Sequence, residues 1–480
     1  MDCLSSEDKR RHDYFLKMIE ARSTEFRNTH RILLIGTGES GKSTFVKQLK
    51  LLSSPKQTFT EEYRVRFIPE IQRNVVQALS NIVNFMILED IPFGKNKKKL
   101  ESAKKAIIKA YAEVHVNPDN INDYTNNPDT AKREEFYDHC AMLWDDEVVK
   151  ETQLRGNEFQ QIDCAQYFLD KLGTIRAPGY MPTDEDILQC RTKTLGIHTE
   201  SILYNNVPFE LVDVGGQREQ RAKWIEAMTD GVTAVIFLTD VSAYDRMLEE
   251  DNTVNRLRES YHLFGQVWTK SLLKDKSFIL FLNKQDKLSD KIRSERNPIS
   301  DFFPEFEEQK CNFTIELLSD LKASREKKNK NENELWDKHF SYFLPPKADG
   351  AAWKDEGKNP MDTQVMAEYG QIQSIISKTV NEGVLNNWVL AGEDQDAVIK
   401  NLLEMDDFQN LNERLFAVPL YRIVSTTHFI KMLFLNECEQ SKTRRIYPYP
   451  TTAIDKRNVD RVFVSCKEIL QGKALTEIMI

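Results

Sequence analysis

A phosphate-loop motif constrains this chain more than any other feature. Residues 36–43 read GTGESGKS and match the pattern G-x-x-x-x-G-K-[ST] between an apolar run, 31–35, and a helix-like stretch, 43–52. Backbone N–H groups in such a turn surround phosphate oxygens, and the following helix N-terminus adds positive potential. The motif predicts that Lys42 reaches the β- and γ-phosphates and that Ser43 ligates Mg²⁺. A glycine-rich turn without a ligand explains neither the lysine nor the hydroxyl.

Strand-like and helix-like segments alternate on both sides of a long helical block. Apolar runs at 209–213, 233–238 and 277–282 are separated by helical spacers, which predicts a mostly parallel sheet with helices on both faces. Residues 57–179 show helical apolar spacing almost throughout. We therefore expect an α/β domain, residues 31–56 and 180–480, that is interrupted by an all-α domain.

Two further segments have distinct compositions. Residues 1–30 carry apolar side chains at helical spacing among charges and predict an exposed amphipathic helix. Residues 307–422 are rich in charges and turn formers, which predicts a polar insertion of loop or disorder. Helical pieces are expected within this insertion at 371–380 and 396–403.

Composition excludes several classes of protein. The chain carries 66 Lys and Arg against 75 Asp and Glu, for a net charge of −9, which disfavours a nucleic-acid partner. The seven cysteines are scattered and form no C-x-x-C pair, which indicates a reducing compartment. No apolar run approaches the 18 or so residues of a membrane span, and residues 1–30 lack a secretory signal. We expect a soluble protein, with a peripheral membrane anchor left open.

Residues 283–286, NKQD, follow directly on an apolar strand and predict the base preference. Asp286 can accept hydrogen bonds from the N1–H and the exocyclic amine of guanine together, a donor pair that adenine lacks. Asn283 can contact N7 and support the loop, and the aliphatic stem of Lys284 can cover the purine face. Together with the phosphate loop, this motif predicts guanine specificity.

Residues that suit phosphoryl transfer lie near the end of another apolar strand. Asp213 can hold a Mg²⁺-bound water, and the N–H of Gly215 or Gly216 can contact the γ-phosphate. Gln217 can orient an attacking water, and Arg191 can neutralise transition-state charge in cis. The hydroxyl of Thr194 can complete the Mg²⁺ shell. Taken singly, Arg191 and Thr194 suit an ordinary loop better than a catalytic role.

Together these residues resemble the α subunit of heterotrimeric G proteins. The resemblance rests on GTGESGKSTFVKQ at 36–48, RTKTLG at 191–196, DVGGQREQRAKW at 213–224, FLNKQD at 281–286 and TTAID at 451–455. It covers most of residues 1–306 and 424–480, and it implies a Ras-like P-loop GTPase domain with a helical domain that closes over the nucleotide. It also implies that the nucleotide is bound by Glu39, Ser40, Gly41, Lys42, Ser43, Thr44, Asp163, the Leu188-Gln189 position, Arg191, Thr194, Asp213, Gly216, Asn283, Lys284, Asp286 and Ala453, whose N–H would face the purine O6.

The resemblance further implies a function. Family members are GTP-hydrolysing switches that use Mg²⁺ and transmit signals from a membrane receptor to an effector at the cytoplasmic face of the plasma membrane, in complex with a Gβγ dimer. Switch segments are expected around 188–198, 215–228 and 248–259. Arg221 and Glu259 match a pair formed in the GTP state, and Glu39 matches the residue that pairs with Arg191 when the γ-phosphate is absent.

The sequence also departs from the family pattern. Position 2 is Asp, so myristoylation is not expected, and Cys3 is either a palmitoylation site or an exposed thiol. Gln220 and Ala222 replace charged residues of the second switch, which puts the strength of Gβγ or effector contact in question. Residues 287–449 separate the two guanine motifs by much more than the family normally does, so the insertion either gates partners or is a tolerated surface loop.

Two functions of other classes fit the sequence less well than the switch. A P-loop ATPase conflicts with Asn283 and Asp286. A GTP-bound scaffold without catalysis conflicts with Arg191, Thr194 and Gln217.

Overall fold

The computed structural model describes residues 29–94, 97–125, 129–229, 231–326, 336, 338–344, 360–381, 405–438 and 444–478. Cys3, almost all of the predicted amphipathic helix 1–30 and the predicted helical piece 396–403 lie outside these ranges. Of the helices within them, none combines the length and the apolarity needed to cross a bilayer.

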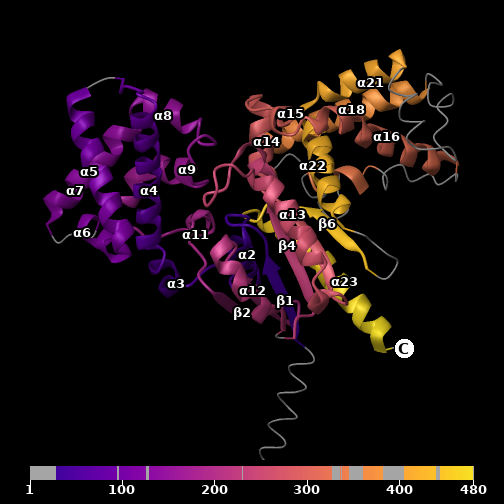
Figure 1. Cartoon of the computed structure of the whole chain (residues 1–480), viewed down its shortest axis with the longest axis horizontal. Coiled ribbons are helices and arrows are strands. Elements are labelled where there is room, and N and C mark those ends of the chain that lie inside the picture. The colour runs from indigo at the N-terminus through magenta and orange to yellow at the C-terminus, as the bar shows by residue number, and fades with distance from the viewer. Residues whose placement is uncertain are drawn as a thin grey trace, which may run out of the picture.

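A six-stranded sheet forms the centre of the α/β part (Figure 1). Its order is β2-β3-β1-β4-β5-β6, in which β2 is antiparallel to β3 and every other neighbouring pair is parallel. Every residue of β4 and β5 is buried, as expected for parallel strands that are covered on both faces. The strands are β1 (His30–Ile35), β2 (Ile197–Tyr204), β3 (Val207–Val214), β4 (Ala234–Asp240), β5 (Ser277–Asn283) and β6 (Ile446–Pro450).

Helices cover both faces of this sheet, because the strands carry apolar side chains on both faces. On one face α2 (Lys42–Ser53) and α23 (Lys456–Ile478) pack through Phe45 and Phe463. On the other face lie α12 (Trp224–Thr229), α13 (Arg256–Trp268), α14 (Gln285–Ser294) and α22 (Pro419–Asn436). Short turns and helices complete this part: η2 (Arg218–Lys223), η3 (Val241–Asp245), η4 (Ser271–Leu273) and α15 (Ile299–Phe302).

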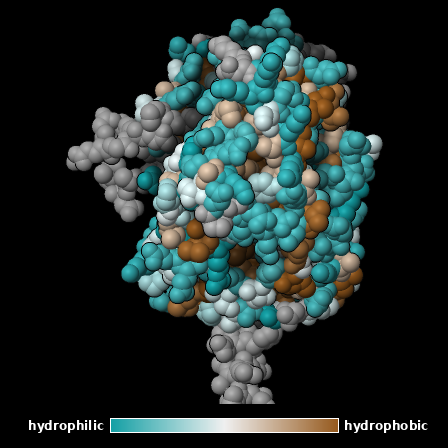
Figure 2. Space-filling model, turned by 90° about the vertical axis from the view of Figure 1, so that its left-hand side faces the viewer, coloured by the Kyte–Doolittle hydropathy of each residue, from teal (hydrophilic) through white to brown (hydrophobic). Residues whose placement is uncertain are grey.

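The helical block stands beside the sheet domain and has a core of its own (Figure 1). Its longest helix, α4 (Ile68–Leu88), places Ile71, Leu79 and Ile82 in that core with no exposed surface. The face seen in Figure 2 is largely hydrophilic, because the apolar stripes of the helices point inward. The other elements are α3 (Glu61–Val65), α5 (Lys97–Val116), η1 (Pro118–Asn120), α6 (Ile121–Thr125), α7 (Thr130–Trp144), α8 (Glu147–Gln153), α9 (Ala165–Asp170), α10 (Leu172–Ile175) and α11 (Asp184–Gln189). The predicted α/β fold with an inserted all-α domain is confirmed.

The interpretation of residues 307–422 as loop or disorder is wrong for the part that the structure describes. This part contains α16 (Glu305–Glu326), α18 (Pro360–Asn381) and α21 (Asp406–Phe416), and the predicted boundary at 422 falls inside α22. The predicted helical piece at 371–380 is confirmed, since it lies within α18. These helices share a buried apolar cluster that includes Phe313, Leu317, Phe340, Ile372, Leu411 and Tyr421. The prediction failed because it relied on the average composition of the segment. Each helix buries only one apolar stripe, and its other residues are polar, so the average does not reveal the stripe. We call this unit, residues 305–422, the inserted module.

Truncating the centre of this cluster tests whether the module is packed. Phe340 is fully buried and lies against Phe313, Trp336 and Tyr369. Phe340→Ala should reduce the local opening free energy of α16 and α18 by about 3–5 kcal/mol, because a large cavity is left in the core. Hydrogen exchange of their amides measures this loss. Met405→Ala, at a side chain that is 40% exposed, should change it by less than about 0.5 kcal/mol. Equal exchange in both variants would contradict a packed module.

Candidate functional site

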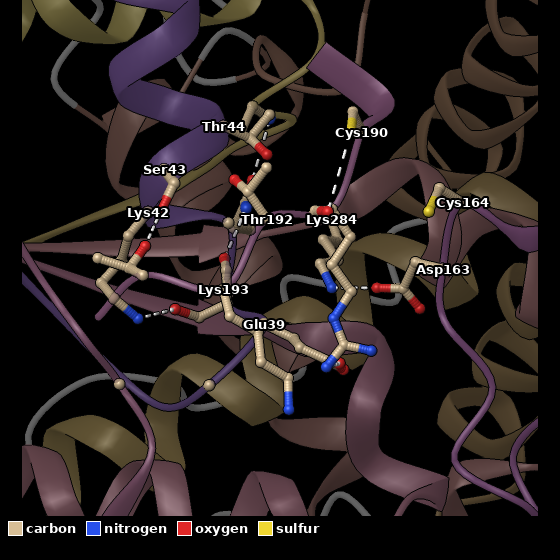
Figure 3. Close-up of a pocket in the computed structure, with 18 of the residues that line it drawn as sticks. Glu39, Lys42, Ser43, Thr44, Asp163, Cys164, Cys190, Thr192, Lys193 and Lys284 are labelled. Carbon is tan, nitrogen blue, oxygen red and sulfur yellow. Dashed lines mark hydrogen bonds and ion pairs between the residues drawn. The ribbon is translucent and has the colours of Figure 1, made fainter. Parts of the chain in front are cut away.

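One cavity brings most of the predicted site residues together (Figure 3). Its walls come from loops at the carboxyl ends of parallel strands, where α/β sheets bind ligands, and from the edge of the helical block. The lining includes residues 38–44 of the phosphate loop, Asp163, Leu188 to Thr194, Gly216 and Gln217, Leu248 to Glu250, Asn283, Lys284, Asp286 and Ala453. Asp213 is buried beneath the cavity and contacts Ser43.

The phosphate loop has the backbone that its glycines permit. Gly41 has a φ of 98°, and a Cβ on Gly36 would lie 2.1 Å from the Leu238 carbonyl oxygen. The Lys42 ammonium donates to the Thr37 carbonyl at 2.8 Å and to the Gly36 carbonyl at 3.1 Å. Burial lowers the pKa of Lys42 to about 8, although Asp213 opposes the shift. A phosphate group would offer this buried ammonium a full counter-charge.

A cluster of oxygen atoms suits a magnesium ion. The Ser43 Oγ lies 2.6 Å from both the Thr194 Oγ1 and the Asp213 Oδ2. The other carboxylate oxygen, Asp213 Oδ1, is buried and has no hydrogen-bond partner in the structure. Burial also raises the pKa of Asp213, against the opposing effects of Lys42 and Ser43. Hydroxyl and carboxylate oxygens are the hard ligands that Mg²⁺ prefers, so these residues fit the ion.

The guanine motif is tied to the phosphate loop by a single side chain. The Asn283 Nδ2 donates to the Ser40 carbonyl at 2.8 Å, and its Oδ1 accepts from the Ala453 N–H at 3.0 Å and the Thr451 hydroxyl at 3.2 Å. These hydrogen bonds link the phosphate loop to the turn at Thr451 and Ala453 through Asn283, as a loop-supporting residue would. The contacts of Asn283 with N7 and of the Ala453 N–H with O6 stay predictions.

Lys284 and Asp286 border the same cavity. Lys284 has a φ of 65°, and its ammonium contacts Asp163 of the helical block and Asp240, the latter at 2.8 Å. Asp286 lines the cavity, and burial raises its pKa, although Lys287 partly offsets the rise. Hydrogen-bond donors of a guanine edge would satisfy this carboxylate.

Arg191 and Gln217 are both linked to Glu249, a residue that sequence reasoning missed. A guanidinium nitrogen of Arg191 lies 2.5 Å from Glu39 Oε1 and 3.4 Å from Glu249 Oε2, and the Gln217 amide donates to the same Glu249 oxygen at 3.4 Å. The Arg221–Glu259 ion pair is also present, at 2.7 Å. The structure thus combines two ion pairs that the family resemblance assigns to different nucleotide states.

Residues of the helical block close the cavity through contacts that no local motif indicates. Asn74 of α4 accepts from the Arg191 N–H at 2.9 Å and donates to its carbonyl at 3.0 Å. Arg246 pairs with Asp163 at 2.7 Å. Arg256 contacts Glu39 at 2.5 Å and Gln160 at 3.1 Å. These partners lie far apart in the sequence, so only the folded chain reveals them.

Another cluster of potential metal ligands lies in the inserted module, at Glu316, Asp320 and His339. The Asp320 Oδ2 already contacts the Lys338 ammonium and, at 2.8 Å, the His339 Nε2. The Asp320 carboxylate therefore already has two side-chain partners within the module.

Glu39 provides a prediction with a pH dependence. Burial raises the pKa of Glu39, but Arg256 and Arg191 more than offset burial and lower it from 4.5 to about 2. The charged form therefore contributes stability above pH 4.5, and this contribution is lost as the pH falls towards 2. E39Q should lower the unfolding free energy of the nucleotide-free protein by about 3 kcal/mol at pH 7, and by progressively less below pH 4.5.

Urea unfolding at pH 7, 4 and 3 measures this difference. E158Q, which removes an exposed ion pair with Arg155, serves as the matched control and should cost less than about 1 kcal/mol. If E39Q lowered the unfolding free energy by the same amount at every pH, the stabilising role assigned to the charged form of Glu39 would be contradicted.

Comparisons with known proteins identify the family of the chain. The family model described as "G-protein alpha subunit" matches residues 9–344. The guanine nucleotide-binding protein G(s) subunit alpha of Drosophila pseudoobscura pseudoobscura is 41% identical over 302 residues, which is 63% of this chain and 75% of the relative. The G(olf) subunit alpha of Homo sapiens is 40% identical over 301 residues, 62% of this chain and 73% of the relative. The chain therefore belongs to the G-protein alpha subunit family.

Proposed function

We propose that this chain is a GTP-hydrolysing molecular switch that binds guanine nucleotide and Mg²⁺. The observation that carries the proposal is the shared cavity, which places Lys42, Asp286, Arg191 and Gln217 around one space. A phosphate site, a guanine-selective carboxylate and two groups suited to phosphoryl transfer thus surround the same ligand volume. An ATPase would not need a half-buried carboxylate such as Asp286 at the base.

The proposed chemistry assigns a role to each group. Lys42 and the backbone N–H groups of residues 38–44 hold the phosphates. Ser43 and Thr194 would hold Mg²⁺, with Asp213 binding a water of the ion, and Mg²⁺ neutralises phosphate charge when bound. Gln217 orients the attacking water, and Arg191 stabilises the charge that develops on the phosphoryl oxygens. Arg191 has to exchange Glu39 for the phosphate to act in this way. This exchange would couple hydrolysis to the arrangement of the switch segments.

Partners are proposed from family membership. Relatives named as G(s) and G(olf) alpha subunits support a role between a membrane receptor and an effector, with a Gβγ dimer and at the cytoplasmic face of the plasma membrane. The side chain of Gln220 accepts a hydrogen bond from the Gly196 N–H at 3.0 Å, so this departure from the family pattern links two switch segments. Attachment through Cys3 remains a proposal outside the described residues.

Single-turnover hydrolysis tests the proposal. Purified protein loaded with GTP should release phosphate after Mg²⁺ is added, and Gln217→Leu should slow this release by about 100-fold or more, because the water loses its orienting amide. Nucleotide affinity should change little, since Gln217 binds neither the base nor the magnesium.

Glu219→Gln, in the same switch, is the matched control and should hydrolyse GTP at the wild-type rate. Absence of phosphate release from the wild-type protein would favour a non-catalytic scaffold. Unchanged release from Gln217→Leu would remove Gln217 from its role.

A further inference from the structure

The helix that carries the guanine motif is held at its far end by the inserted module. Helix α14 begins at Gln285, next to Asp286, and Arg293 lies in its last turn. Both guanidinium NH groups of Arg293 bind the carboxylate of Glu368 in α18, at 2.6 and 2.9 Å. The side chains are only 14% and 10% exposed, so water screens this pair weakly.

Glu368 also organises the start of α22. Its Oε2 accepts from the Leu420 N–H at 3.0 Å, and its Oε1 accepts from the Gln364 side chain at 3.1 Å. A carboxylate at a helix N-terminus satisfies an N–H group that has no partner within the helix, and it interacts favourably with the helix dipole. One carboxylate from the inserted module therefore joins α14, α18 and α22.

The same helix α22 reaches the guanine motif directly. The Thr427 hydroxyl donates to the Gln285 Oε1 at 3.0 Å, and both residues are buried. The Gln285 N–H in turn donates to the Thr451 carbonyl at 3.2 Å, next to the turn that contains Ala453. A displacement of α22 or of the far end of α14 would therefore move Asp286 relative to the phosphate loop.

We infer that Glu368 is a positioning residue for guanine recognition: through Arg293 and α22, the inserted module holds Asp286 in place and slows nucleotide release. The inference rests on the proposed nucleotide binding and extends it to regulation. A partner that bound the module and loosened the Arg293–Glu368 pair would accelerate exchange. The module acts here as a brake on release built into the chain.

Glu368→Gln tests this role because it removes the charge and preserves the shape. Release of GDP from the full chain, followed with a fluorescent GDP analogue, should accelerate by about 2- to 30-fold, the range for mutations that alter coupling within a network. The preference for GDP over IDP should narrow as well. Hypoxanthine lacks the 2-amino group, so a displaced Asp286 loses more with guanine than with hypoxanthine.

Two further variants make the experiment decisive. Arg422→Ala removes an exposed ion pair between α22 and Glu295, just beyond α14, and should release GDP at the wild-type rate. Thr427→Val removes the hydroxyl that bonds Gln285 and the Ile423 carbonyl of its own helix. The loss of the bond to Gln285 should accelerate release, so this variant decides the question if Glu368→Gln does not fold.

Wild-type release and wild-type GDP/IDP preference in both Glu368→Gln and Thr427→Val would overturn the inference, even if their melting temperatures fell. A wild-type protein that did not prefer GDP to ADP would instead refute the proposed function.

Discussion

The site depends on the side-chain amide of Asn283, which joins three loops that are far apart in the sequence. Its Nδ2 holds the phosphate loop at Ser40, and its Oδ1 holds the turn at Thr451 and Ala453. Asn283 is 1% exposed, so an unmade hydrogen bond there would carry the full desolvation cost of a buried polar group. The amide therefore fixes the distance between the phosphate site and the base site, and a ligand has to match that distance.

Charges that are largely shielded from solvent organise the space around this bridge. Glu39 lies between Arg191 and Arg256, and Asp163 lies between Lys284 and Arg246. Because Asp163 belongs to the helical block, its pairs with Lys284 and Arg246 also hold that block against the sheet domain. Such pairs are costly to separate, since each would leave a poorly solvated charge behind. A phosphate that competes with Glu39 for Arg191 would change this balance, which is how a nucleotide could alter the switch segments.

The sequence predicted the features that depend on local motifs, and it missed those that depend on tertiary contact. The phosphate loop, the NKQD segment and Gln217 are contiguous signals whose chemistry follows from residue type and neighbouring strand. Glu249, Arg256 and Asn74 carry no such signal, because their roles come from partners brought close by folding. The inserted module was misjudged for a related reason: its apolar residues form one core only after separate helices pack together.

Equilibrium competition between guanine and adenine nucleotides is the most direct measurement of what this site does. Displacement of a fluorescent GDP analogue by GDP and by ADP, with Mg²⁺ present, gives the two dissociation constants. A site built to hydrogen-bond the guanine edge should favour GDP by about 10⁴-fold, because ADP would leave the half-buried Asp286 carboxylate unpaired. Equal displacement by ADP and GDP would contradict the account.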